Sequence, residues 1–129
     1  MLNLILVEDN PADVNFFRMI LKKHGVEHTL YVFNSGDAAR DYFDAGIDTG
    51  LSGIVLDLNI PNFNGFQLLS WLRSDTRYSN VPVAVLSTSD SRNDMDRVIQ
   101  NNASFYTKSF TLAEVENTVV NIIEEFTVR

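Results

Sequence analysis

Short apolar runs alternate with longer amphipathic segments along the chain. Five runs rich in Val, Ile and Leu predict β-strands at residues 3–7, 29–33, 53–57, 81–87 and 104–108. The central runs are almost continuously apolar, as expected of strands that helices cover on both faces. Because alternating strands and helices are typical of βα units that build a parallel sheet, the pattern predicts an α/β fold.

The segments between the strands carry the signals of helix ends. Asn10 and Pro11 predict the start of a first helix, and Gly25 predicts its end. Further helices are expected at residues 35–44, after Asn64 and Gly65 through residue 72, and at residues 92–101.

A fifth helix is predicted near the end of the sequence. Thr111 is expected to cap it, with Glu114 three residues later as in a capping box. The spacing of apolar residues predicts its buried stripe, which comprises Leu112, Val115, Val119, Ile122 and Phe126.

Composition narrows the class of protein. With 129 residues, 45% of them hydrophobic and 21% charged, the chain is expected to form one soluble domain over residues 1–129. Neither a secretory signal nor a membrane span is found, and there is no cysteine, so we expect a cytoplasmic protein that does not bind membranes. The net charge of −7 disfavours direct binding to nucleic acid.

Polar residues occur where the predicted strands end. Glu8 and Asp9 close the first strand, Asp57 the third, Ser87 the fourth and Lys108 the fifth. Open α/β sheets bind ligands at the carboxyl ends of their strands, beside the point where the strand order reverses. With a strand order of 2-1-3-4-5, the three carboxylates are expected to meet at this point.

The combination of these residue types indicates phosphoryl chemistry. Three clustered carboxylates repel one another unless a cation is present, and oxygen-only ligands favour Mg²⁺. With the metal bound, the Asp57 carboxylate is expected to attack phosphorus and form an aspartyl phosphate. The Lys108 ammonium would pair with a phosphoryl oxygen, and the Ser87 hydroxyl would hydrogen-bond another.

The segments VEDNPADV, LDLNIPNFNG, VLSTSD and YTKSF resemble the conserved motifs of response-regulator receiver domains, the CheY-like family. The resemblance covers essentially the whole chain. It implies a flavodoxin-like (βα)5 doubly wound parallel sheet with strand order 2-1-3-4-5. Within the family, EDNPADV and STSDSRNDMDR are similar to single-domain regulators that partner bacterial phytochromes.

The resemblance implies roles for individual residues. Glu8 and Asp9 match the metal-binding pair, Asp57 the phosphorylation site and Lys108 the active-site lysine. With Asp57, the backbone carbonyl of Asn59 is expected to complete the Mg²⁺ site.

Other matching positions concern signalling rather than metal binding. Ser87 matches the switch hydroxyl and Phe105 the aromatic residue that changes rotamer with it. Asn59 and Ser89 match the two positions that tune the lifetime of the phosphoryl group. The signal is expected to leave through a face made by the fourth helix, the fifth strand and the fifth helix.

The resemblance implies a two-component response regulator. We expect it to receive a phosphoryl group from a sensor histidine kinase, of the phytochrome type, and to signal to a downstream protein or to form a homodimer. It is not expected to be an enzyme beyond its own phosphorylation and dephosphorylation, because no insertion is long enough for the cap of an aspartyl-phosphate hydrolase.

An alternative is a pseudo-receiver, a phosphorylation-independent interaction or dimerisation module. It is suggested by Ser109, which follows Lys108 where the family usually has a proline in a cis bond.

Asp13 lies one helical turn after Asp9. We expect it to be a first-turn carboxylate that the helix dipole favours. The alternative is that Asp13 reaches the water shell of the metal.

Overall fold

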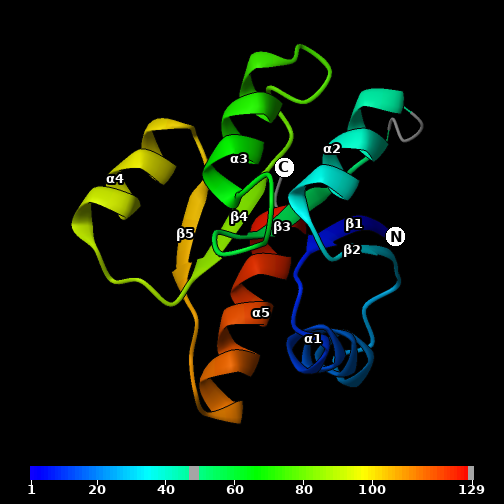
Figure 1. Ribbon diagram of the computed structural model, residues 1–129. Coiled ribbons are helices and arrows are strands. Elements are labelled where there is room, and N and C mark those ends of the chain that lie inside the picture. Colours follow the sequence, from blue (N-terminus) through cyan, green and yellow to red (C-terminus); the bar gives the residue numbers. More distant parts are fainter. Residues whose placement is uncertain (47–49, 128–129) are drawn as a thin grey trace.

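Across residues 1–46 and 50–127, which the computed structural model describes, five strands alternate with five helices (Figure 1). The strands are β1 (Leu2–Val7), β2 (His28–Phe33), β3 (Gly53–Asp57), β4 (Val83–Ser87) and β5 (Ser104–Thr107). The helices are α1 (Pro11–Lys23), α2 (Gly36–Ala45), α3 (Gly65–Ser74), α4 (Arg92–Gln100) and α5 (Leu112–Thr127). Among these residues, no helix combines the length and hydrophobicity that crossing a bilayer requires.

The strands form one parallel sheet in the order β2-β1-β3-β4-β5. This confirms the predicted doubly wound, flavodoxin-like topology. The chain moves outward from β1 to β2 and then crosses to β3 on the other side of β1. The carboxyl ends of β1 and β3 therefore lie side by side where the strand order reverses.

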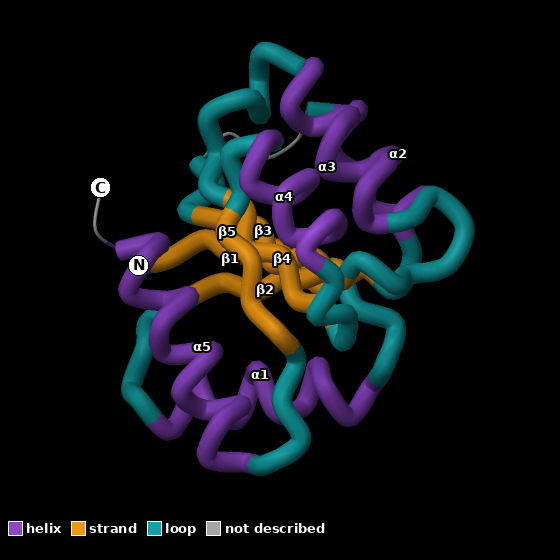
Figure 2. The backbone as a smooth tube through the Cα atoms, turned by 90° about the vertical axis from the view of Figure 1, so that its left-hand side faces the viewer, coloured by secondary structure: helices purple, strands orange, loops and turns teal. Residues whose placement is uncertain are grey.

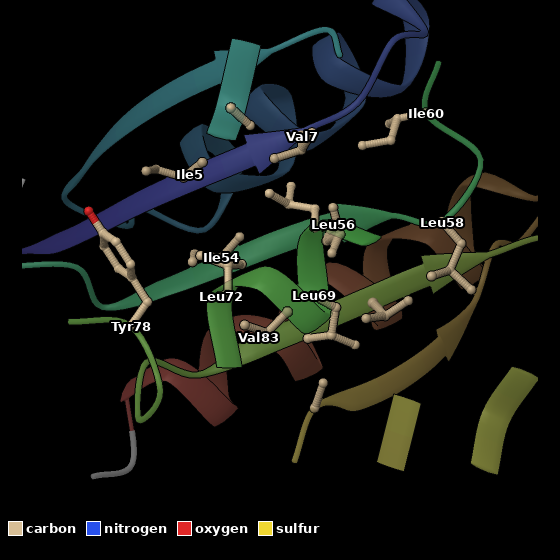
Figure 3. Packing of buried hydrophobic residues seen from close by; sticks show 14 of the residues in the cluster. Ile5, Val7, Ile54, Leu56, Leu58, Ile60, Leu69, Leu72, Tyr78 and Val83 are labelled. Atoms are coloured by element: carbon tan, nitrogen blue, oxygen red, sulfur yellow. The ribbon is translucent and has the colours of Figure 1, made fainter. Parts of the chain in front are cut away.

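The sheet is the middle of three layers, with α1 and α5 on one face and α2, α3 and α4 on the other (Figure 2). Side chains alternate between the two faces, so that Ile5 and Val7 join the core beneath α2–α4 and Leu4 and Leu6 join the core beneath α1 and α5. Figure 3 shows the larger of these two cores. Because both faces are buried, the strands need apolar residues at almost every position.

The predicted fourth strand begins two residues too early. Val81 belongs to the preceding turn, because its N–H donates to the Tyr78 carbonyl at 3.1 Å and its own carbonyl accepts from the Arg73 guanidinium at 2.7 Å. The fifth strand ends one residue before Lys108, although the Lys108 N–H still donates to the Ser87 carbonyl at 2.7 Å. The other strand predictions agree with the structure within one residue.

The fifth helix begins as predicted, but its buried stripe starts later. The Thr111 hydroxyl accepts a hydrogen bond from the Glu114 N–H at 3.2 Å, which confirms the cap. Val119, Ile122 and Phe126 are buried, whereas Leu112 is 62% exposed, so its assignment to the core was wrong. The reason is that α5 starts beyond the carboxyl end of β5, where no strand lies beneath its first turn.

Candidate functional site

Three carboxylates converge where β1 and β3 end. Glu8 and Asp9 directly follow β1 and Asp57 is the last residue of β3. One oxygen from each of them lies within 4.8 Å of those of the other two. Glu8 and Asp57 are 2% and 4% exposed, while Asp9 is exposed to solvent. The structure thus brings together the acidic residues that the sequence analysis placed at this crevice.

Hydrogen bonds from the backbone orient the two buried carboxylates. Oδ1 of Asp57 accepts from the N–H of Asn59 at 3.0 Å, and Oε2 of Glu8 accepts from the N–H of Asn10 at 3.3 Å. The Glu8 N–H in turn donates to the Phe33 carbonyl at 2.9 Å, which extends the pairing of β1 with β2 beyond the last strand residue. Both carboxylates are therefore held by backbone N–H groups of the residues that follow them.

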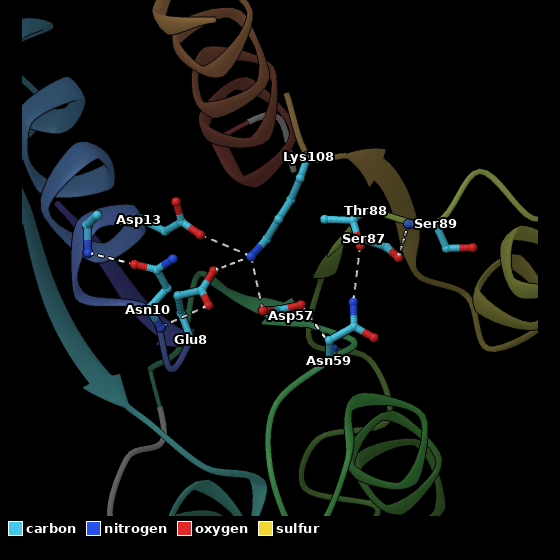
Figure 4. Close-up of polar contacts among 10 residues, drawn as sticks. Glu8, Asn10, Asp13, Asp57, Asn59, Ser87, Thr88, Ser89 and Lys108 are labelled. Carbon is cyan, nitrogen blue, oxygen red and sulfur yellow. Dashed lines mark hydrogen bonds and ion pairs between the residues drawn. The ribbon is translucent and has the colours of Figure 1, made fainter. Parts of the chain in front are cut away.

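Lys108 reaches the same place from the loop after β5 (Figure 4). Its Nζ donates to Glu8 at 2.7 Å, to Asp57 at 3.0 Å and to Asp13 at 3.1 Å. The Lys108 side chain is only 19% exposed. Across residues 1–46 and 50–127 no peptide bond is cis, so Ser109 follows Lys108 through a trans bond and the ammonium still lies at the acidic cluster.

Burial and charge act on Glu8 and Lys108 in opposite directions. The pKa of Glu8 is raised to about 8, because burial and the neighbouring Asp57 raise it by more than the hydrogen bond from Lys108 lowers it. For Lys108, burial lowers the pKa, but the hydrogen bonds to Glu8 and Asp57 outweigh burial and leave this pKa above its usual value. Lys108 therefore remains charged throughout the physiological pH range.

Hydroxyl and amide groups lie on the other side of Asp57 from Glu8 and Asp13 (Figure 4). Ser87 is buried, and its Oγ accepts from the Ser89 N–H at 3.0 Å. The Asn59 amide donates to the Thr88 hydroxyl at 3.4 Å, which links the loops after β3 and β4. Asp57 is thus flanked by an ammonium on one side and by neutral polar groups on the other.

Phe105 contributes to the hydrophobic core. It is half-buried in β5 and packs against the core beneath α2–α4. Ser89, in the loop after β4, accepts from the Ser91 N–H at 3.1 Å through its Oγ. The switch and lifetime roles of these residues stay predictions.

Gly65 allows α3 to begin close to the loop that follows Asp57. Its N–H donates to the Leu58 carbonyl at 3.2 Å. A Cβ at this position would lie 2.5 Å from the Leu58 Cα and 2.7 Å from the Asp57 carbonyl oxygen, closer than real contacts allow. Only glycine fits here, so Gly65 fixes the path of the chain around Asp57.

Two contacts of this site were not predicted from the sequence. Asp13 lies in the first turn of α1 as expected, and its carboxylate also contacts the Lys108 ammonium. Thr88 was given no role, yet it receives the Asn59 amide. The position of Asp13 one turn after Asp9 was the available signal for the first contact, but its partner lies 95 residues away in the sequence.

The chemistry of the donors fits two kinds of ligand. Clustered carboxylate oxygens without nitrogen or sulfur donors suit a hard divalent cation. An ammonium and a hydroxyl on either side of the Asp57 carboxylate suit the oxygens of a tetrahedral anion.

Known proteins with similar sequences and structures share this arrangement of elements. The chain is 30% identical over 125 residues to the probable methanogenesis regulatory protein FilR2 of Methanothrix harundinacea, covering 94% of this chain and 81% of that protein. Its structure is similar to that of the phosphorylated cyanobacterial phytochrome response regulator RcpA, with a TM-score of 0.89, 29% identity, and coverage of 98% and 94% of the two chains.

A second solved structure, the Mn²⁺-bound form of the response regulator Rcp1, has a TM-score of 0.87 and 27% identity. The match covers 95% of this chain and 91% of that structure; the Rcp1 of Synechocystis sp. is also a relative in sequence. The sequence profile of the response regulator receiver domain matches residues 4–120. On the evidence of fold, acidic crevice and sequence together, this chain belongs to the response regulator receiver domain family of two-component systems.

Proposed function

We propose that the chain accepts a phosphoryl group on Asp57 from a sensor histidine kinase. The observation that carries this proposal is the position of the Lys108 ammonium, 3.0 Å from a carboxylate that is 4% exposed. Membership of the receiver family and similarity to the phosphorylated RcpA support it.

In the transfer step, a carboxylate oxygen of Asp57 forms a bond to phosphorus and the bond from phosphorus to the donor nitrogen breaks. The electron pair of the broken bond stays on the imidazole of the donor histidine, which accounts for all electrons. Lys108 and Ser87 would supply hydrogen bonds to the phosphoryl oxygens as negative charge develops.

Magnesium is the cation that we expect at the acidic cluster. Glu8, Asp9, Asp57 and the backbone carbonyl of Asn59 would hold it. When bound, Mg²⁺ would neutralise part of the charge on the carboxylates and on the phosphoryl group. The Mn²⁺-bound form of Rcp1 shows that a response regulator of similar structure binds a divalent cation, which supports this expectation.

The signal would arise from the side of Asp57 that faces Ser87. A hydrogen bond from Ser87 to the phosphoryl group would draw its hydroxyl inward and let Phe105 turn, which remodels the face formed by α4, β5 and α5. A shift from mostly inactive to mostly active needs about 5.5 kcal/mol of differential stabilisation. Asn59 and Ser89 would set how long the phosphoryl group survives.

Several broader expectations belong to the same proposal. Residues 1–129 would act as a single receiver domain in the cytoplasm, passing the signal to a downstream protein or to a second copy. Two response regulators of bacterial phytochromes are similar in structure, which supports a phytochrome-type kinase. The chain would catalyse only its own phosphorylation and dephosphorylation.

Labelled acetyl phosphate tests the acceptor residue. With Mg²⁺ present, the wild-type chain is expected to incorporate label and Asp57→Asn to incorporate none, because an amide is a poor nucleophile. Asp37→Asn, which removes a first-turn carboxylate of α2, serves as a folded control that retains the acceptor. No labelling of the wild type would favour the pseudo-receiver. Equal labelling of the wild type and Asp57→Asn would place the phosphoryl group on another residue and contradict the proposal.

The raised pKa of Glu8 predicts how Mg²⁺ should stabilise the protein at different pH values. Without metal, the folded chain keeps the Glu8 proton up to about pH 8, whereas the unfolded chain releases it near 4.5. The contribution of Glu8 to the free energy of unfolding therefore falls as the pH rises between these values. Since the metal requires a charged carboxylate, stabilisation by Mg²⁺ should increase over the same range.

Thermal unfolding with and without Mg²⁺, at about pH 5.5 and about pH 8, measures this effect. In Glu8→Gln, the increase of Mg²⁺ stabilisation with pH should be much smaller. An equal Mg²⁺ effect at both pH values in the wild type would contradict the prediction.

A further inference from the structure

Asp13 makes a contact that the proposed transfer step does not use. It lies in the first turn of α1 and its Oδ2 is 3.1 Å from the Lys108 ammonium. Its side chain is 40% exposed, so the contact lies at the rim of the site rather than deep within it. The residue approaches Lys108 from α1, whereas Asp57 approaches from β3 (Figure 4).

Helix capping does not explain this position of the Asp13 side chain. Asn10 caps α1 by accepting from the Ala12 N–H at 2.9 Å. In a capping box, the residue at the third helical position, here Asp13, would accept from the N–H of the cap residue. That N–H donates to Glu8 instead.

The three carboxylates match the donors of the ammonium in number. A lysine ammonium has three N–H groups, and Lys108 has one carboxyl group to accept from each: those of Glu8, Asp57 and Asp13. A lysine side chain has four rotatable carbon–carbon bonds, so contacts at its end are needed to fix where the charge lies. In phosphorylated protein one Asp57 oxygen would carry the phosphoryl group, leaving Asp13 and Glu8 to hold the ammonium.

A pocket beside Lys108 gives its side chain room to move away from the acidic cluster. A pocket between α1 and α5 reaches Lys108 and Asp13, and its walls include Phe16, Phe17 and Val115. The space allows the flexible side chain to move once a contact is lost. The walls also include Ser109 and Thr118, whose hydroxyls are neutral and cannot replace the negative charge of Asp13.

We propose that Asp13 is a positioning residue whose carboxylate holds the Lys108 ammonium beside Asp57, so that the positive charge is in place when a phosphoryl group arrives. The inference rests on the proposed acceptor function of Asp57. Asp13 acts through Lys108 and touches no reacting atom.

The ammonium itself provides a readout that needs no phosphorylation. In NMR spectra that detect lysine ammonium groups, the wild type should show a slowly exchanging signal that Lys108→Arg removes. Asp13→Asn should speed its hydrogen exchange with water about fivefold, the effect of one partly exposed ion pair. Asp13→Glu, which keeps the charge, should restore most of the protection.

Phosphorylation kinetics separate this role from metal binding. At saturating Mg²⁺, Asp13→Asn should lower the rate of labelling by acetyl phosphate about fivefold. Asp37→Asn, which removes a first-turn carboxylate of α2, is the matched control and should change neither readout.

Two outcomes would overturn the proposal. One is an ammonium signal that is absent from the wild type or unaffected by Asp13→Asn. The other is an unchanged rate at saturating Mg²⁺ with a higher Mg²⁺ requirement, which would place Asp13 in the water shell of the metal. A wild type that takes no label would refute the acceptor function, while the exchange measurement would still decide whether Asp13 holds the ammonium.

Discussion

Lys108→Met should slow phosphorylation by a factor of about 100 to 1,000 at saturating Mg²⁺, the loss typical of a group that stabilises developing negative charge. The same change should tighten Mg²⁺ binding by about tenfold or more, because a positive charge that now contacts Glu8 and Asp57 would no longer repel the metal. Titration calorimetry with Mg²⁺ and labelling by acetyl phosphate measure the two effects.

The opposite directions of these effects exclude simple misfolding as their cause, since a damaged site would lose both metal and activity. Lys23→Met is the matched control, because Lys23 is exposed and pairs with Glu116 far from the crevice. It should change neither quantity. Weaker Mg²⁺ binding by Lys108→Met would contradict the position of the ammonium within the acidic cluster.

Arg73→Ala should lower the free energy of unfolding by about 3 kcal/mol, because several partly buried carbonyls would lose a charged donor. The guanidinium donates to the backbone carbonyls of Tyr78, Ser79, Val81, Asn101 and Asn102 at 2.7 to 3.3 Å. It thereby joins the end of α3 to the loops before β4 and β5. Burial lowers its pKa, but the side chain stays charged. Urea unfolding at neutral pH measures the change.

Arg73→Lys should recover only part of the loss, since an ammonium cannot reproduce the planar fork that serves both loops. Arg77→Ala is the control, because Arg77 is exposed and its ion pair with Asp75 lies at the surface. It should destabilise the protein much less than Arg73→Ala. Equal effects of the two substitutions would show that the contacts of Arg73 with the two loops contribute little.

The sequence alone was sufficient to predict the α/β fold and to identify the residues of the acidic cluster. Buried strands and helix starts such as Asn10–Pro11 depend on residues that are close to one another in the sequence. They can therefore be predicted from the sequence alone. The parallel sheet then forces strand ends together, which is why Glu8, Asp9 and Asp57 meet as predicted. The strand order itself came from the family resemblance.

Only the tertiary structure decided which charges touch and which surfaces are covered. Asp13 and Lys108 are 95 residues apart, and Arg73 binds carbonyls of two separate loops. Neither contact can be predicted from a local sequence pattern. Leu112 fits the helical period but extends beyond the sheet, and the pKa of Glu8 depends on burial by distant segments. Periodicity shows which side of an element is apolar, whereas the contact partners and the burial of a charge are set by how the elements pack.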